Sequence, residues 1–303
     1  MSRRAFAIAF LTVSLGSIAT HARGTSEGFG SSIVEYVPGA APASGFTLAS
    51  SALGEPTRVS GQPFSPGVVS PFAAAWTPAD VVSIGAGGFI TIQLDAPATD
   101  DANHPFGIDL IVFGNSFFVD VAPPFGVAGG LVSDGGIIDV SADGQSWHEV
   151  TKAAADGLWP TLAFSDAGPY DVVGGEVPSD FRLPMDPTLT VEEALGLPWE
   201  ELVALYGGSG GGRGIDLADL GLAHASYIRV RVPVGHPWHV EVDAVSRTLD
   251  SGGPGPDLDG DGSVGGADLA LLLGAFGHSA DGDANGDGTT DGADLALVLG
   301  AWS

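Results

Sequence analysis

Apolar residues occur between residues 24 and 250 in short runs of strand length, separated by glycine, proline and aspartate. In several runs apolar and polar residues alternate, which is typical of a strand with one buried face. The run 107–114 is apolar apart from Asp109, which favours a strand buried on both faces. The predicted strands are 31–37, 81–85, 88–95, 107–114, 136–141, 147–150, 226–232 and 239–245. Many short strands joined by turns predict an all-β fold, either a sandwich or a barrel.

One segment with helical signals interrupts this pattern. Thr190, with Glu193 three residues later, has the spacing of a capping box, which opens a helix. Pro198 starts a second predicted helix, 199–206, and Gly207 ends it. We therefore expect a short helical insert within the β-domain.

The C-terminal part of the chain is a tandem repeat with an offset of 26 residues. Each copy is an acidic loop, 257–268 or 283–294, followed by an apolar run, 269–276 or 295–302. Calcium loops of the EF-hand type present oxygen ligands at positions 1, 3, 5, 7, 9 and 12, with glycine at position 6. The ligand positions hold Asp257, Asp259, Asp261, Ser263, Gly265 and Asp268 in the first loop, and Asp283, Asn285, Asp287, Thr289, Asp291 and Asp294 in the second.

These two loops predict two calcium sites. Ser263 and Thr289 would contribute carbonyl oxygens, and Gly265 would act through a water molecule. The carboxylates of each loop repel one another, so we expect the loop to open without a cation. The alternative is an acidic low-complexity tail, but two such loops in series, each followed by the same apolar run, favour calcium.

The duplicated loop and helix, with Asp at position 12 and no helix before the loop, resemble a type I dockerin. The resemblance covers residues 257–303 and implies a small calcium-folded module that docks a secreted protein onto a cohesin-like or other surface protein. By the same resemblance, the partner-binding residues are Gly266, Ala267, Leu269, Gly292, Ala293 and Leu295. Well-studied dockerins often carry a hydroxyl pair at loop positions 10 and 11 and a basic pair in the helix. This chain has neither, since no Lys or Arg follows Arg247.

The strand set of the main domain resembles secreted jelly-roll modules of the galactose-binding, discoidin-like superfamily and bacterial cell-surface proteins. The segments that carry this resemblance are 83–92, 109–115, 140–147, 216–219, 227–230 and 242–245. It implies a jelly-roll β-sandwich that binds carbohydrate or a cell surface and is usually non-catalytic. A fold resemblance does not by itself identify a ligand.

The N-terminal sequence and the overall charge predict a secreted protein. Residues 1–22 have the features of a signal peptide: two arginines, an apolar stretch and small residues before the cleavage site. The arginine pair fits either an ordinary Sec signal or a twin-arginine signal. The formal charge is −27, and removal of the two arginines takes it to −29. Such a chain is not expected to bind nucleic acid, which needs clustered Lys and Arg, and no second apolar run of membrane length follows.

Several polar residues of the main domain are candidates for a cation site. His239, Glu241 and Asp243 fall on one face of a predicted strand, where a metal site competes with an ordinary solvated polar face. Asp109, inside an apolar strand, needs hydrogen bonds or a cation if it is buried. A structural calcium is the second candidate. Asn115, Asp216 and Asp219 are the residues that can join Asp109. The loop 95–109, with Asp100, Asp101 and Asn103, is a separate candidate cation loop.

An enzyme is the alternative class of function. Proteins that carry dockerins are often polysaccharide-degrading enzymes, and glycoside hydrolysis needs only a pair of carboxylates across a cleft. The sequence has no His-Glu-x-x-His motif, and no pair of acidic residues has a distinctive context, so a non-catalytic role is favoured. Aromatic residues in predicted loops and in the insert could stack on sugars or pack under the loops; these are Trp76, Trp159, Trp199 and Trp238.

The predicted organisation is a signal peptide at 1–22, a jelly-roll β-sandwich with a helical insert at 24–250, a linker at 251–256 and a dockerin-like, EF-hand-like helical domain at 257–303. The expected function is a secreted, non-catalytic module that binds carbohydrate or a cell surface and is tethered through its tail. The alternative is a glycoside hydrolase delivered by the same tail.

Overall fold

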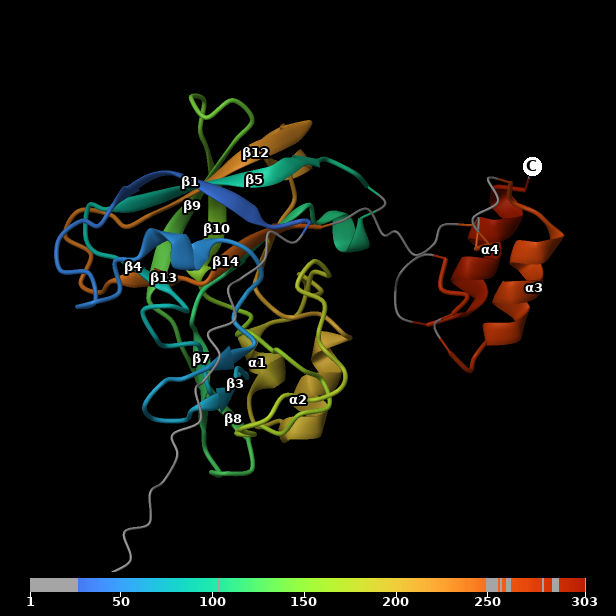
Figure 1. Ribbon diagram of the computed structural model, residues 1–303, viewed down its shortest axis with the longest axis horizontal. Helices are drawn as coiled ribbons and strands as arrows, with labels where there is room; N and C mark the ends of the chain where they lie inside the picture. The colour runs from blue at the N-terminus through green and yellow to red at the C-terminus, as the bar shows by residue number, and fades with distance from the viewer. Residues whose placement is uncertain are drawn as a thin grey trace, which may run out of the picture.

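A five-stranded antiparallel sheet forms one layer of the main domain (Figure 1). Its strands, in spatial order, are β1 (Gly30–Val37), β5 (Phe89–Thr99), β12 (His224–Arg231), β9 (Gly135–Ser141) and β10 (His148–Asp156). Ile228 of β12 aligns with Ile92 of β5 on one side and with Val140 of β9 on the other. This register sets one apolar row across three strands, as the alternation in the sequence predicts.

Shorter strands form the layer that faces this sheet across the core. They are β11 (Arg213–Ile215), β6 (Leu110–Phe113) and β14 (Ala244–Arg247) in one sheet, and β13 (Val240–Val242) with β4 (Val82–Ile84) in another. Buried residues from both layers, such as Ile92, Ile228, Val112 and Val242, belong to one hydrophobic cluster. The main domain is therefore β-rich, as predicted, and its assignment as a jelly roll stays a prediction.

The helical insert has a smaller core of its own, beside the short strands at the far end of the main domain from the five-stranded sheet (Figure 1). The elements here are α1 (Val191–Ala194), α2 (Trp199–Tyr206), β2 (Val59–Ser60), β3 (Gly67–Val68), β7 (Phe117–Asp120) and β8 (Ala128–Val132). Thr190 and Glu193 form the predicted capping box, and Pro198 is the N-cap residue rather than the first helical residue of α2. Three single turns of 3-10 helix complete the described elements, at Ala49–Ala52, Pro105–Gly107 and Ala218–Leu220.

The predicted strand 239–245 is broken at Asp243. β13, before this residue, pairs with β4, and β14, after it, pairs with β6. The Asp243 carboxylate is fully buried and accepts hydrogen bonds from the backbone N–H and the hydroxyl of Thr57, at 2.9 and 3.0 Å. A buried carboxylate must be hydrogen-bonded, and Thr57 meets this need at the residue where the pairing changes from β4 to β6.

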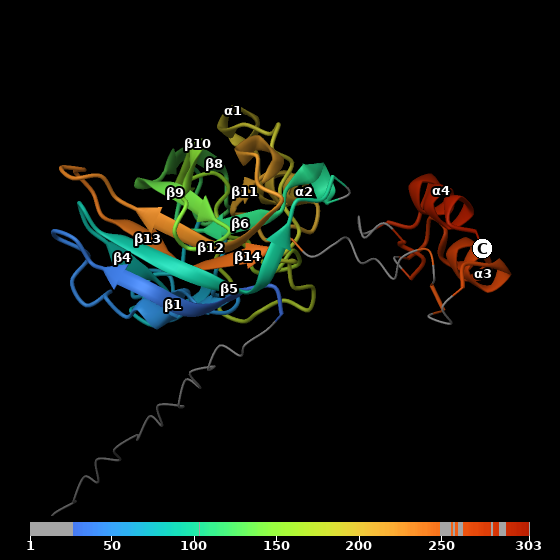
Figure 2. The same cartoon turned by 90° about the horizontal axis from the view of Figure 1, so that it is seen from above.

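The tail contains two helices, α3 (Gly266–Ala275) and α4 (Gly292–Gly300), which lie side by side in both views (Figures 1 and 2). Each helix begins within its acidic loop, three residues before the predicted apolar run. The reason is visible in α3, where the Asp268 carboxylate accepts a hydrogen bond from the backbone N–H of Gly265 and caps the helix. Leu272, Ala284 and Val298 are the buried residues of a separate core.

The computed structural model describes residues 27–102, 104–248, 256, 258–259, 263–279, 281–284 and 289–302. The predicted signal peptide and nearly all of the predicted linker lie outside these ranges. So do the predicted ligand residues Asn103, Asp257, Asp261, Asn285 and Asp287. Within the described residues, no helix is long and apolar enough to cross a membrane.

Candidate functional site

A cavity of about 430 Å³ opens among the loops of the main domain and has aromatic walls. Phe64, Phe72, Trp76 and Phe117 line it. The Trp76 ring stacks on Phe46 with 4.3 Å between the ring centroids, so its orientation is fixed by packing. An aromatic ring held in this way suits the apolar face of a sugar or a cation.

Two carboxylates are among the polar groups that line the same cavity. Glu241 on β13 and Asp134 in the turn between β8 and β9 both line it. Glu241 is fully buried, and its Oε1 lies 2.6 Å from Nδ1 of His239. Its other oxygen, Oε2, is buried without a hydrogen-bond partner. Burial raises the pKa of both carboxyls.

Asp156 of β10 joins the two loops that carry Asn115 and Asp134. Its Oδ1 accepts the backbone N–H of Asn115 at 2.9 Å, and its Oδ2 accepts the backbone N–H of Asp134 at 2.8 Å. Burial raises the pKa of the Asp156 carboxyl to about 7. A Cβ on Gly114 would lie 2.4 Å from Asp156 Oδ1, so glycine is needed for this close approach. Asn115, which we expected near Asp109, therefore belongs to the cavity.

The predicted trio of His239, Glu241 and Asp243 is not brought together as a metal site. His239 contacts Glu241, whereas Asp243 binds Thr57. The break between β13 and β14 at Asp243 accounts for this difference. Glu241 lies in the wall of the cavity instead. The alternation of residues along the strand could not predict this position.

The second candidate cation site is brought together. In the part of the chain that the structure describes, only Asp100, Asp109 and Asp216 form a group of three whose ligand atoms all lie within 4.8 Å of one another. Two segments that we treated as separate candidate loops therefore meet at one place. Asp219 lies close enough for its charge to add to burial in raising the pKa of Asp216. Carboxylate oxygens grouped in this way are the ligands that a hard cation such as calcium prefers.

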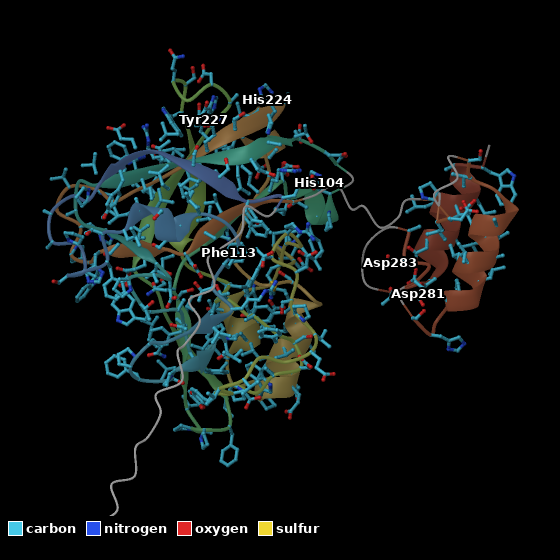
Figure 3. The ribbon with its side chains drawn as sticks, in the orientation of Figure 1. His104, Phe113, His224, Tyr227, Asp281 and Asp283 are labelled. Carbon is cyan, nitrogen blue, oxygen red and sulfur yellow. The ribbon has the colours of Figure 1, made fainter. Side chains whose placement is uncertain are left out.

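Hydrogen bonds already satisfy the buried Asp109. Its Oδ1 accepts the backbone N–H of Asp101 at 3.2 Å and lies 2.7 Å from Nδ1 of His104, which Figure 3 labels beside the turn Pro105–Gly107. Its Oδ2 accepts the backbone N–H of Leu217 at 2.8 Å. The burial of Asp109 therefore needs no cation, and any cation here would rely on the more accessible Asp100 and Asp216.

The tail loops bury three of their predicted calcium ligands. Asp268, Asp283 and Asp294 are all buried, and Figure 3 labels Asp283 on its loop beside the tail helices. Asp268 accepts backbone N–H groups of Gly265, Leu258 and Asp259, and these hydrogen bonds, that of Gly265 first, lower its pKa below the ordinary value. Buried carboxylates in a segment without Lys or Arg fit a calcium site.

Exposed apolar side chains on the tail helices repeat with the 26-residue offset. They are Leu271, Leu273 and Phe276 in the first copy and Leu297, Leu299 and Trp302 in the second. Of the predicted partner-binding residues, Gly266, Ala267 and Gly292 are exposed, whereas Leu269 and Leu295 pack partly against the tail core. The side chain of Ala293 lies outside the described residues. The sequence analysis did not single out these exposed apolar residues. A helix that is apolar on every face is either buried or covered by a partner, so the apolar runs could have indicated them.

The four tryptophans that we considered as sugar-stacking residues have different surroundings. Trp159 is buried in the core of the helical insert, and Trp199 donates from Nε1 to the carbonyl of Ala167 at 3.0 Å beside it. Both therefore pack under loops. Trp76 lines the cavity, and Trp238 is exposed on a loop.

No family model matches the sequence, and no curated protein matches it significantly. The resemblances of the tail to dockerins and of the strands to jelly-roll modules therefore stay predictions. The function has to be argued from the cavity, the carboxylates and the tail helices.

Asp156→Asn is expected to flatten the pH dependence of stability. The pKa of Asp156 is raised from 3.8 to about 7 on folding, so the folded state keeps a proton that the unfolded chain has released. The free energy of unfolding of the wild type should therefore fall as the pH rises from about 4 to 7, and this part of the slope should vanish in the variant. Urea unfolding across that range measures the slope.

The matched control for this change is Glu35→Gln, which removes an exposed carboxylate on β1. The control should keep the wild-type slope. A slope in Asp156→Asn equal to that of the wild type would show that Asp156 ionises normally in the fold.

The tail fragment 250–303 is expected to lose its helical circular dichroism when calcium is chelated. Its core has only three buried apolar residues among those described, too few to offset the repulsion within two acidic loops. Asp261→Ala and Asp287→Ala should each remove one of two calcium sites in calorimetry. Asp281→Ala, an exposed residue outside both loops, should leave both sites. A fragment that binds no calcium would disprove the site assignment.

Proposed function

We propose that the protein is a secreted, non-catalytic module that binds carbohydrate through the cavity lined by Trp76 and Glu241. Its calcium-folded tail, related to dockerins, would tether it to a cohesin-like or other surface protein. The main domain would then be a binding domain of the jelly-roll type.

The cavity is the observation that supports binding. Its aromatic walls offer flat apolar faces, and the carboxylates and the Gln62 side chain offer polar groups that can accept hydrogen bonds from hydroxyls. Trp76 is held by its contact with Phe46, so little conformational entropy is lost when a sugar stacks on it.

The repeated apolar side chains of the tail support tethering. Soluble proteins seldom expose several large apolar residues on two short helices unless a partner covers them. Leu273 and Leu299 occupy the same position in their repeats, and each is exposed by more than half. Each repeat would therefore present an equivalent docking face, which includes the predicted contacts at Ala267 and Ala293.

A glycoside hydrolase is the second candidate, because two carboxyls with raised pKa line one cavity. Glu241 could hold a proton for a leaving group while Asp134 acts as the base or nucleophile. Asp156 is not available for this chemistry, since both of its oxygens bind backbone N–H groups. Release of reducing sugars from a polysaccharide, lost in Glu241→Gln, would favour this candidate over the binding module.

Trp76→Ala is expected to weaken binding to any oligosaccharide that a glycan array identifies by at least about tenfold, because the stacking surface is lost. Trp238→Ala, which removes an exposed tryptophan that does not line the cavity, should bind as the wild type does. Calorimetry with the identified oligosaccharide measures both variants. Binding that survives Trp76→Ala unchanged, or no hit on the array, would rule out this cavity as the sugar site.

The double substitution Leu273→Glu with Leu299→Glu is expected to abolish calcium-dependent capture of a partner from the culture supernatant of the source organism. Either single substitution should weaken capture by no more than about twofold, since the other repeat can still dock. Leu48→Glu, at a similarly exposed leucine of the main domain, is the control. Capture that persists in the double variant would exclude these faces.

A further inference from the structure

The cavity carries negative charge that no lysine or arginine in its wall compensates. Of the residues that line it, Asp134 and Glu241 are acidic and none is basic. An anionic ligand would meet two carboxylates in a partly desolvated place, which is unfavourable. The charge therefore selects for a neutral or a cationic ligand.

One oxygen of Glu241 favours a cationic ligand over a neutral one. Glu241 is fully buried, and its Oε1 is held by the ring of His239. Oε2 belongs to the same carboxylate and is buried without a hydrogen-bond partner, in a residue that lines the cavity. A buried carboxylate oxygen without a partner is costly, and a cation that donates hydrogen bonds removes that cost most effectively.

The charged groups near Glu241 also favour a cationic ligand. Burial raises the pKa of Glu241, the charge of Asp134 raises it further, and only Ser83 and His239 lower it. The charges of Asp134 and Glu241 also help to raise the pKa of Asp156, whereas the charges of His239 and His236 lower that of Asp134. A bound cation would stabilise all three carboxylates at once.

The aromatic walls suit a cation that is part of a sugar. The face of an aromatic ring attracts a cation, and it also stacks on the C–H face of a sugar ring. We propose that this cavity selects oligosaccharides whose sugars carry a protonated primary amine, with the ammonium group at Oε2 of Glu241. The inference rests on the proposed sugar-binding function and specifies its ligand class.

Three tetrasaccharides with the same β-1,4 linkage test this, namely those of glucosamine, N-acetylglucosamine and glucose. They differ mainly at one substituent, which is an ammonium, a neutral amide or a hydroxyl. Calorimetry uses the full chain with calcium near neutral pH, because acid would protonate Glu241, whose pKa is raised by burial, as well as the amine. The glucosamine tetrasaccharide should bind at least about tenfold more tightly than the other two, as a charge-assisted hydrogen bond predicts.

Glu241→Gln should abolish this preference, because the amide keeps the shape of the side chain and removes the charge. Glu35→Gln removes one exposed charge from β1 and should keep the preference, which separates a specific site from general attraction to an acidic protein. Asp134→Asn is the second cavity variant, for use if Glu241→Gln does not fold, and should reduce the preference.

The possible failures can be told apart. Equal binding of all three tetrasaccharides, or an equal loss in Glu241→Gln and Glu35→Gln, would overturn the amine selectivity and leave sugar binding intact. No binding of any tetrasaccharide, together with no hit on a glycan array, would overturn the proposed function as well.

Discussion

Hydrogen bonds from backbone N–H groups to buried carboxylates hold the loops of this protein in place. Asp156 joins two loops, Asp109 joins two others, and Asp268 closes the first tail loop. A chain with 37 acidic and 10 basic residues cannot pair most of its carboxylates with side-chain cations. Backbone amides supply the missing donors, and the strands and loops are arranged around that need.

Glu241 differs from these carboxylates, and the difference separates structure from function. Each oxygen of Asp156 has a backbone donor, so the residue is a positioning group. Glu241 is buried as deeply but keeps one oxygen without a partner beside a cavity. Among the described residues Glu241 is the one acid with a buried oxygen that lacks a hydrogen-bond partner, and the proposed ligand site rests on this difference.

The alternation of apolar residues was enough to predict the main strands, because burial of one face depends on local sequence. Ile92 and Ile228 illustrate this, since each lies in a predicted strand and in the core. The break at Asp243 was not predictable, since its partner Thr57 is 186 residues away in the sequence. The hairpin of β7 and β8 was also missed, because its second strand contains two glycines and has no clear alternation.

The candidate site, too, was only partly predictable from the sequence. The acidic residues were visible in the sequence, and the pairing of Asp109 with Asp216 was expected. The role of Asp134 and Asp156 was not, since neither has a distinctive local context. The role of these two residues depends on which loops meet in the folded structure. A local sequence pattern does not contain that information.

The matching positions of exposed leucines on α3 and α4 have a geometric consequence for the main domain. If either helix face can dock, the tail can sit on one partner in two orientations. The main domain would then project from the anchoring surface in two directions, according to which repeat is engaged. Neighbouring copies of the protein could therefore present their cavities in different directions, to differently placed strands of an irregular, insoluble polymer.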